Sequence, residues 1–281
     1  MGLGKLTVEE IVSKLRPIDD IFFHKLAETE GFCEELLQVI LKNNIELIEV
    51  TPQKSLRNIK AKSVTIDVYC VDTDNKYYNI EVQKSDNDEH EKRVRYNGSN
   101  MDTYITEKGI KYKDLPESYV IYITEFDMFD EGETIYHIIR SIKETKKKVY
   151  NGFNEIYVNT LIDDGSDIAE LMKIFKSSDV PDNKKFPRVC EAIKAIKEEK
   201  GSGDMCKLVE DYGKQERREG KREGKREGKL EGKLEGRREG KFEAKRDLII
   251  NLMETMNVSM SQSMDMLLIP EEEREIYMEM I

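Results

Sequence analysis

The sequence has 281 residues, enough for one well-buried domain and an appendage, because single cores usually close at about 100 to 200 residues. Charged residues make up 37% and the net charge is −11, which excludes a uniformly basic protein that coats nucleic acid. The four cysteines form no CxxC pair and have no histidine at metal-ligand spacing, which argues against a zinc site. No apolar run of about 18 residues occurs, so we expect a soluble cytoplasmic protein with no membrane partner.

The predicted elements alternate between helical and strand patterns along the first 200 residues. Helical spacing of apolar residues predicts helices over 7–26, 31–43, 166–177 and 185–199, and a polar helix over 86–109 that ends at a glycine. Strands are predicted over 63–71, 76–84, 119–126, 134–142 and 153–162. This order favours an α/β fold, a mixed sheet flanked by helices.

From Glu219 the composition changes to a four-residue repeat of a basic residue, a variable residue, Glu, and Gly or Ala. Each glycine costs a helix about 1 kcal/mol relative to alanine, while pairs such as Glu223 with Arg226 support one. The pattern leaves a marginal helix and a flexible connector as alternatives. The tail has helical periodicity and a methionine stripe, typical of a small core or an oligomer contact, so a homo-oligomer through the repeat and tail is one expectation.

The stretch IDVYCVDTDNKYYNIEVQK, residues 66–84, predicts a hairpin with carboxylates in its strands. Even-numbered residues are apolar and should face the core, whereas the odd-numbered ones include Asp67, Asn79, Glu81 and Gln83. Keeping both apolar sets on one face requires the numbers of paired residues to sum to an even value. A three- or five-residue loop around TDN gives a sum of 148, which places Asp67 opposite Glu81.

Opposed β-carbons lie about 4.5–5.5 Å apart, so two carboxylates there repel unless a proton or cation lies between them. Oxygen-rich pairs of this kind suit Mg²⁺, which often completes its shell with substrate phosphate. The alternative is a solvated face on which Asp67 and Glu81 pair with lysines such as Lys62.

The hairpin resembles the active-site hairpin of the PD-(D/E)XK nuclease superfamily, and more narrowly the bacterial recombination-promoting nuclease and putative transposase family. Further similar segments are DDIFFHKL, with Asp20 and Phe23, then RVRYNGSNMD, YKDLPESYVIYITEF, and the Glu-Gly repeat before a helical tail. The resemblance implies a restriction-endonuclease-like mixed sheet with a helical C-terminal extension. The implied domains are a nuclease-like domain over 1–165, a helical extension over 166–213, a repeat connector over 214–246 and a helical tail over 247–281.

Carried over position by position, the resemblance makes Asp67 and Glu81 the metal-binding carboxylates, with Mg²⁺ as the cofactor and Mn²⁺ as an alternative. Gln83 occupies the position of the superfamily's catalytic lysine, and Ile66 that of its proline. Glutamine at this site is usual in the narrower family, although an amide supplies only dipoles where lysine supplies charge. His24 stands where the family shows lysine, and Asp20 is either an outer metal ligand or a helix cap.

Arg93, Asn97, Asn100 and Tyr104 recur at helical spacing in the predicted polar helix. Such a stripe can contact phosphates and sugars of DNA, and it can equally be a salt-bridged helix surface. The resemblance thus implies a metal-dependent DNA endonuclease associated with recombination or mobile elements, with Asp67, Glu81 and Gln83 as catalytic residues. The alternative is a catalytically inactive DNA-binding or oligomerisation module on a nuclease scaffold.

Overall fold

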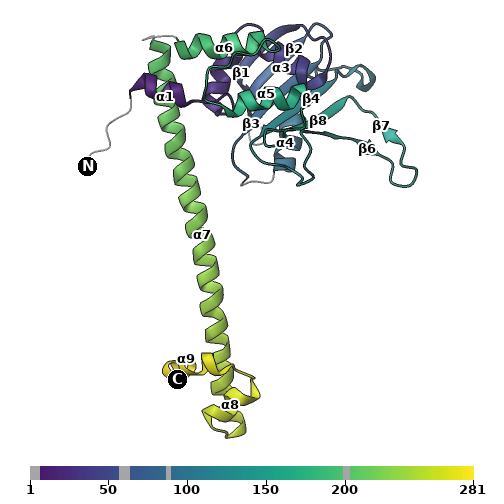
Figure 1. Ribbon diagram of the computed structural model, residues 1–281. Helices are drawn as coiled ribbons and strands as arrows, with labels where there is room; N and C mark the ends of the chain where they lie inside the picture. The colour runs from purple at the N-terminus through teal and green to yellow at the C-terminus, as the bar shows by residue number, and fades with distance from the viewer. Residues whose placement is uncertain (1–6, 57–63, 87–89, 199–202) are drawn as a thin grey trace. The chain divides into compact units, whose positions relative to one another are not determined.

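The computed structural model describes residues 7–56, 64–86, 90–198 and 203–281. Its centre is a six-stranded mixed sheet in the order β1-β2-β3-β4-β8-β5 (Figure 1). The strands are β1 (Leu47–Leu56), β2 (Val64–Asp72), β3 (Tyr77–Gln83), β4 (Ser118–Thr124), β5 (Ile135–Ile138) and β8 (Phe153–Asn159). β3, β4 and β8 run parallel, while β1, β2 and β5 pair antiparallel with their neighbours. The predicted α/β fold with a mixed sheet is confirmed.

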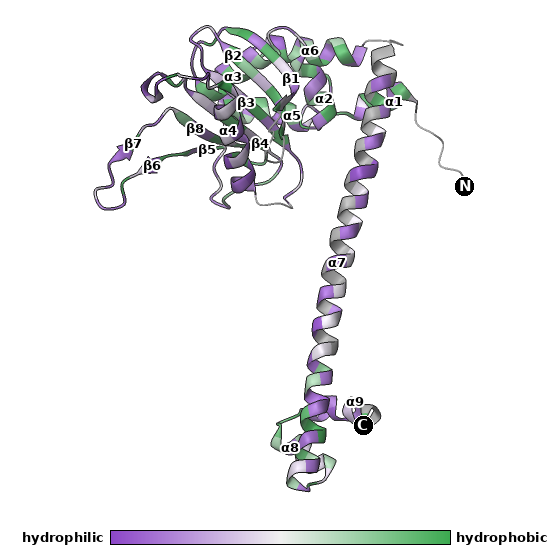
Figure 2. Ribbon diagram, turned by 180° about the vertical axis from the view of Figure 1, so that it is seen from behind, coloured by the Kyte–Doolittle hydropathy of each residue, from purple (hydrophilic) through white to green (hydrophobic). Residues whose placement is uncertain are grey.

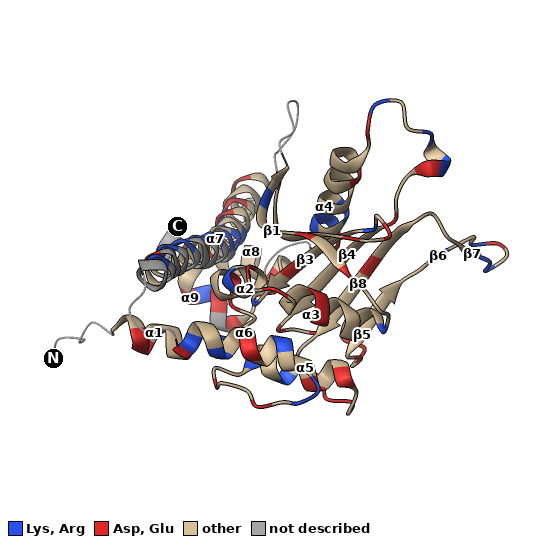
Figure 3. Cartoon of the chain, turned by 90° about the horizontal axis from the view of Figure 1, so that it is seen from above, with Lys and Arg blue, Asp and Glu red and all other residues tan. Residues whose placement is uncertain are grey.

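Helices cover both faces of the sheet, and Figure 3 shows α4 on one side with α2, α3, α5 and α6 on the other. The helices are α1 (Val8–Lys14), α2 (Asp20–Ala27), α3 (Phe32–Leu41), α4 (His90–Ile105), the short 3-10 helix η1 (Tyr112–Asp114), α5 (Asp167–Lys176) and α6 (Pro187–Glu198). Each side has its own apolar core, and Figure 2 shows hydrophobic residues along the central strands. The proposed solvated face is therefore wrong for the centre of the sheet, where Glu81 is 0% exposed.

The β2–β3 register is the predicted one, with pairs from Val68–Ile80 to Val71–Tyr77. The recorded pairs end at Val68–Ile80, one position before Asp67 and Glu81. At that point the Asp67 carboxylate accepts a hydrogen bond of 3.1 Å from the backbone N–H of Val82. A side chain thus takes the place of a ladder hydrogen bond where the two strands part. Lys62, the suggested partner of these carboxylates, lies outside the described residues.

The structure differs from the sequence prediction at two N-terminal elements. The helix predicted over 7–26 is divided into α1 and α2, because Pro17 favours extended backbone before it and lacks an N–H. The edge strand β1 was not predicted: it contains Pro52 and many exposed residues, as edge strands do.

The segment between β4 and β8 also differs from the prediction of one strand over 134–142. It forms the short β5 and then β6 (Arg140–Ser141), which pairs with β7 (Lys148–Val149) in a separate two-stranded sheet. Because β5 pairs with β8 only up to Ile138, the chain beyond it leaves the main sheet as a hairpin.

The chain divides into two compact units, residues 1–212 and 213–281. The repeat is helical, since α7 runs from Gly203 to Met256. α8 (Met260–Met266) and α9 (Glu271–Met280) complete the second unit around a small core of Ile249, Met264, Ile269 and Tyr277. The domain boundaries and oligomerisation inferred from the sequence stay predictions. No helix in the described ranges is long and apolar enough to cross a membrane.

Candidate active site

Glu81 lies on β3 and faces α4, and its side chain is fully buried. Its Oε1 accepts hydrogen bonds of 3.0 Å from the side-chain amides of Asn79 and Asn97. Its Oε2 lies 3.5 Å from the guanidinium of Arg93. Asn79 comes from the same strand face two residues earlier, while Arg93 and Asn97 come from one face of α4. The helix therefore supplies the polar lining above this carboxylate.

The protonation of Glu81 is strongly perturbed. Burial first, and then the negative charge of Asp67, raise the pKa of Glu81 to about 8, against the opposing effects of Arg93, Asn79 and Asn97. The repulsion expected for two neighbouring carboxylates is thus present in the protein without metal. A buried carboxyl group whose pKa is strongly raised is typical of functional sites, where a bound ligand balances the charge.

Gln83 is uncharged, but its side chain binds the positively charged guanidinium of Arg93. Its Oε1 accepts a hydrogen bond of 3.1 Å from Arg93, and its Nε2 donates one of 3.0 Å to the carbonyl of Ser85. The guanidinium of Arg93 consequently bridges the side chains of Gln83 and Glu81. Lys84, the neighbouring lysine, instead pairs with Asp19 at 3.2 Å, next to the start of α2.

Asp67 meets two residues of α2. One ligand atom each from Asp20, His24 and Asp67 lies within 4.8 Å of the others. The His24 Nε2 is 3.1 Å from Asp20 Oδ1 and 3.8 Å from Asp67 Oδ1. Burial opposes protonation of His24, but its hydrogen bond to Asp67 and the charges of Asp20 and Asp67 outweigh this and raise its pKa. Asp20 is the first residue of α2, whereas the N-cap position belongs to Asp19.

His24 is oriented from behind by Gln53 of β1. The Gln53 side-chain nitrogen lies 2.9 Å from His24 Nδ1, and Gln53 has a left-handed φ of 51°. The flanking pairs Pro52–Val68 and Lys54–Ile66 place Gln53 across from Asp67. Such a conformation is uncommon for a residue other than glycine, so its side chain enters the site at a cost in backbone energy.

The donors of this cluster fit a divalent cation. The His24 Nε2 is buried, and the carboxylates of Asp20 and Asp67 both face it. Two carboxylate oxygens and one imidazole nitrogen suit Mn²⁺ better than Mg²⁺, because Mg²⁺ prefers oxygen ligands alone. His24 can ligate a cation through Nε2 only when its proton is on Nδ1. The Gln53 amide accepts a hydrogen bond from that Nδ1–H when its oxygen, not its nitrogen, faces the ring.

The residues of the predicted DNA-binding stripe take different positions. Asn97 is buried against Glu81, and Asn100 is buried with its side-chain amide donating to the carbonyl of Tyr96 at 2.7 Å. Tyr104 is half exposed and packs edge-on against Tyr69. Of the four residues, Arg93 and Asn97 join the surroundings of Glu81, and the DNA contacts predicted for the stripe remain untested.

Two residues of the site were missed by the sequence analysis as functional candidates. Asn79 was placed on the same face as Glu81 by alternation, and its amide beside a carboxylate was the available signal. Gln53 had no such signal, since its strand was not predicted and its partner His24 is 29 residues away.

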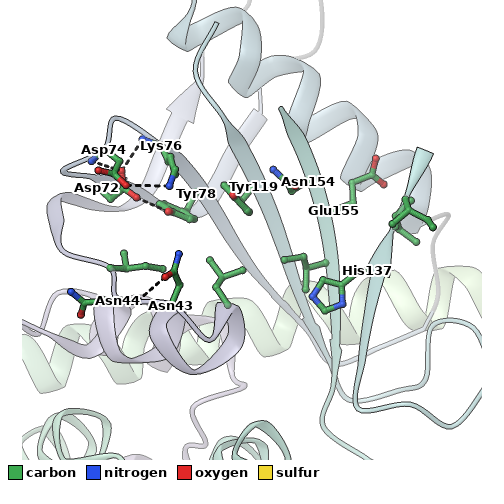
Figure 4. A pocket seen from close by; sticks show the side chains of 15 residues that line it. Asn43, Asn44, Asp72, Asp74, Lys76, Tyr78, Tyr119, His137, Asn154 and Glu155 are labelled. Atoms are coloured by element: carbon green, nitrogen blue, oxygen red, sulfur yellow. Dashed lines mark hydrogen bonds and ion pairs between the residues drawn. The ribbon is translucent and has the colours of Figure 1, made fainter. Parts of the chain in front are cut away.

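Two cavities elsewhere in the unit of residues 1–212 include neither Asp67 nor Glu81. One, of about 310 Å³, lies at the N-terminal ends of β3, β4 and β8 and is shown in Figure 4. There Tyr78 stacks on Tyr119, with ring centroids 5.0 Å apart, and its hydroxyl donates to Asp72 at 2.6 Å. These polar groups already bind one another, so the cavity offers no cluster comparable to that around Asp67.

Comparison with known proteins agrees with this geometry. The family model described as PD-(D/E)XK nuclease family transposase matches residues 22–162, which include β2, β3 and α4. A search of curated proteins and a search of solved structures give no match. The mixed sheet flanked by helices is consistent with a restriction-endonuclease-like fold. The chain belongs to the PD-(D/E)XK nuclease family transposases.

Proposed function

We propose that this protein is a metal-dependent DNA endonuclease that acts in recombination or on mobile elements. The observation that carries the proposal is the convergence of Asp67, Glu81 and a cationic Arg93 where β2 and β3 part, inside a fold whose family implies DNA as the substrate. Hydrolysis of a phosphodiester needs a positioned water and compensation of charge on the phosphoryl oxygens. A cytoplasmic location, where DNA is accessible, belongs to the same proposal.

Asp67, Asp20 and His24 would hold the cation. Glu81, on β3, would supply a further negative charge that balances the charge of the cation. When bound, Mg²⁺ or Mn²⁺ supplies an activated water and neutralises negative charge on the scissile phosphate. Asn79 and Asn97 hold the Glu81 carboxylate in one orientation through its Oε1. Gln83 orients Arg93, whose guanidinium is suited to binding phosphate.

Nicking of supercoiled plasmid tests the proposal. The parent protein should nick in Mg²⁺ or Mn²⁺ and stop in EDTA, and Asp67→Asn should abolish nicking while thermal melts show a folded protein. Asp74→Asn, in the exposed turn of the same hairpin, is the matched control and should cleave like the parent. Cleavage by Asp67→Asn at the parent rate would place the active site elsewhere.

The alternative, a catalytically inactive DNA-binding or oligomerisation module, is favoured by one observation: no lysine occupies position 83. It predicts DNA binding that is equal in EDTA and Mn²⁺, with no nicking under either condition. Fold alone does not separate the two functions, because function resides in the site.

A further inference from the structure

The β6–β7 hairpin, residues 139–150, is a surface that the catalytic proposal does not use. It leaves the main sheet after β5 and returns to it at β8, and Figure 1 shows it extending away from the sheet. Every residue from 139 to 150 is exposed. An isolated two-stranded hairpin is at best marginally stable in water, so this ribbon adds little to the stability of the fold.

The ribbon is positively charged, whereas the protein as a whole is negatively charged. It contains Arg140 and four lysines, Lys143, Lys146, Lys147 and Lys148, against the single acidic residue Glu144, which gives a net charge of +4 within a chain of −11. Figure 3 shows blue residues at its tip. In the described part of the chain none of the four lysines forms an ion pair, whereas Arg140 pairs with Glu155 at 3.3 Å.

Apolar and aromatic side chains flank these cations on both strands of the ribbon. Tyr150 is 69% exposed and Ile139 is 59% exposed, while Ile142 and Val149 are 41% and 45% exposed. A ribbon with cations beside apolar and aromatic groups matches a phosphate backbone with sugars and base edges between its strands. Duplex DNA carries about one negative charge per 1.7 Å, and its major groove, about 12 Å wide, admits a two-stranded ribbon.

The base of the ribbon is fixed to the sheet. The Arg140 guanidinium donates to the carbonyl of Phe153 at 3.2 Å and to Asn151 at 3.3 Å, and it lies 5.2 Å from the centroid of the Phe153 ring. A basic arm held at its base keeps a defined direction, which lowers the entropy lost on binding.

The base of the ribbon lies on the same sheet as Glu81, a short distance from it. Glu81 pairs with Tyr122 and Tyr122 with Tyr157, so Phe153 is two strands across and four residues along from Glu81. With strands about 4.8 Å apart and a rise of about 3.3 Å per residue, this separation is roughly 16 Å. This separation is shorter than one turn of DNA, which is about 34 Å.

We infer that the β6–β7 ribbon is a DNA-binding arm that enters the major groove beside the site of cleavage. The inference rests on the proposed function, because it names the surface that holds the substrate of that site. Its four lysines position the duplex without reading sequence, and the exposed Ile142, Val149 and Tyr150 face sugars and base edges.

The test is fluorescence anisotropy with a labelled duplex in EDTA, where no cleavage occurs. One variant replaces Lys143, Lys146, Lys147 and Lys148 with Gln. The matched control replaces four exposed lysines on α1, α5, α6 and the loop before α6 with Gln, namely Lys14, Lys176, Lys194 and Lys184, and changes the net charge equally. Because none of these lysines is buried, both variants should melt like the parent.

The ribbon variant should bind the duplex at least tenfold more weakly at low salt, and the log–log salt slope should become shallower by about 3 to 4, about 0.9 per lost phosphate contact. The control should stay within twofold of the parent. Binding of a single-stranded oligonucleotide with the same number of phosphates should weaken less than duplex binding. Equal weakening in both variants, or no weakening in the ribbon variant, overturns the inference and leaves an acidic protein as the partner that the ribbon fits. Equal weakening for duplex and single strand overturns the groove assignment.

These outcomes are separate from those of the cleavage assay. A parent that binds DNA through the ribbon but never nicks plasmid contradicts the endonuclease proposal alone. A parent that nicks plasmid, with a ribbon variant that binds and nicks equally well, contradicts the arm alone.

Discussion

Gln83 and Arg93 form a hydrogen bond of 3.1 Å that joins the end of β3 to α4. The position at which the superfamily has lysine therefore carries an amide, and the positive charge reaches Glu81 from the helix instead, at 3.5 Å. An amide that accepts from a guanidinium orients that cation and still contributes a dipole to the site. Arg93 thus supplies near Glu81 the positive charge that Gln83, in place of lysine, lacks.

This relationship predicts that Arg93→Ala lowers the rate of plasmid nicking by roughly 10² or more, the usual loss when a group that stabilises transition-state charge is removed. Gln83→Lys in the Arg93→Ala background should restore part of the rate, because lysine brings the charge back from the strand. Arg95→Ala, on the exposed face of the same helix, is the control and should keep the parent rate. Failure of the double variant to exceed Arg93→Ala would assign Arg93 a role other than charge.

The stability of the metal-free protein should fall as pH rises from about 5 to 8. Burial and the charge of Asp67 raise the pKa of Glu81 to about 8, above its ordinary value of 4.5. The folded state consequently binds more protons than the unfolded state in this window, so each increase in pH favours unfolding. Each tenfold difference in proton affinity between the two states corresponds to about 1.4 kcal/mol, so the loss of stability is on the order of several kcal/mol.

Urea unfolding in EDTA at a series of pH values measures this effect. Glu81→Gln should flatten the dependence, and its metal-free form should be more stable than the parent at pH 8. Asp74→Asn, with an exposed carboxylate, should follow the parent curve. Parallel curves for the parent and Glu81→Gln would mean that Glu81 titrates normally.

The group of Asp20, His24 and Asp67 predicts a preference among metals. Because a cation that binds only the folded state raises stability, the parent should show a larger increase in melting temperature with Mn²⁺ than with Mg²⁺ at equal concentration. His24→Gln should lose this difference while keeping an increase in Mg²⁺. His137→Gln, on the exposed part of β5, should behave like the parent. A His24→Gln variant that keeps the Mn²⁺ preference would show that the imidazole is not a ligand.

Two glycine-to-alanine substitutions should change the stability of the folded protein in opposite directions. A β-carbon on Gly98 of α4 would collide with the ring of Phe153, so Gly98→Ala should destabilise the domain by about 1–3 kcal/mol. It should also reduce nicking, since α4 carries Arg93 and Asn97. At Gly220 of α7 nothing lies within 4 Å, and Gly220→Ala should stabilise the helix by about 1 kcal/mol. Circular dichroism melts measure both.

Adding Phe153→Leu to Gly98→Ala should recover part of the lost stability, because leucine lacks the ring atoms that meet the new methyl group. A Gly98→Ala variant as stable as the parent would mean that α4 can move away from β8 without loss.

The sequence by itself determined the hairpin and its register. Alternation of apolar residues has a period of two, so burying Val68, Cys70, Tyr78 and Ile80 on one face excludes registers that differ by one residue. A short loop around TDN then selects the pairing that is observed. The long apolar run of β4 and the helical spacing of α5 and α6 likewise follow from local periodicity. Asp67, Glu81 and Gln83 could be named as candidates because the resemblance lies in this same local segment.

Only the tertiary structure decided what surrounds those residues. The packing of α4 over the odd-numbered face buries Glu81, which local alternation described equally well as a solvated position. His24 meets Gln53 and Asp67 because α2 lies against β1 and β2, elements distant in sequence, and Gln53 enters only through a left-handed backbone conformation. Burial and charge depend on neighbours from several elements at once, and a one-dimensional pattern does not contain that information.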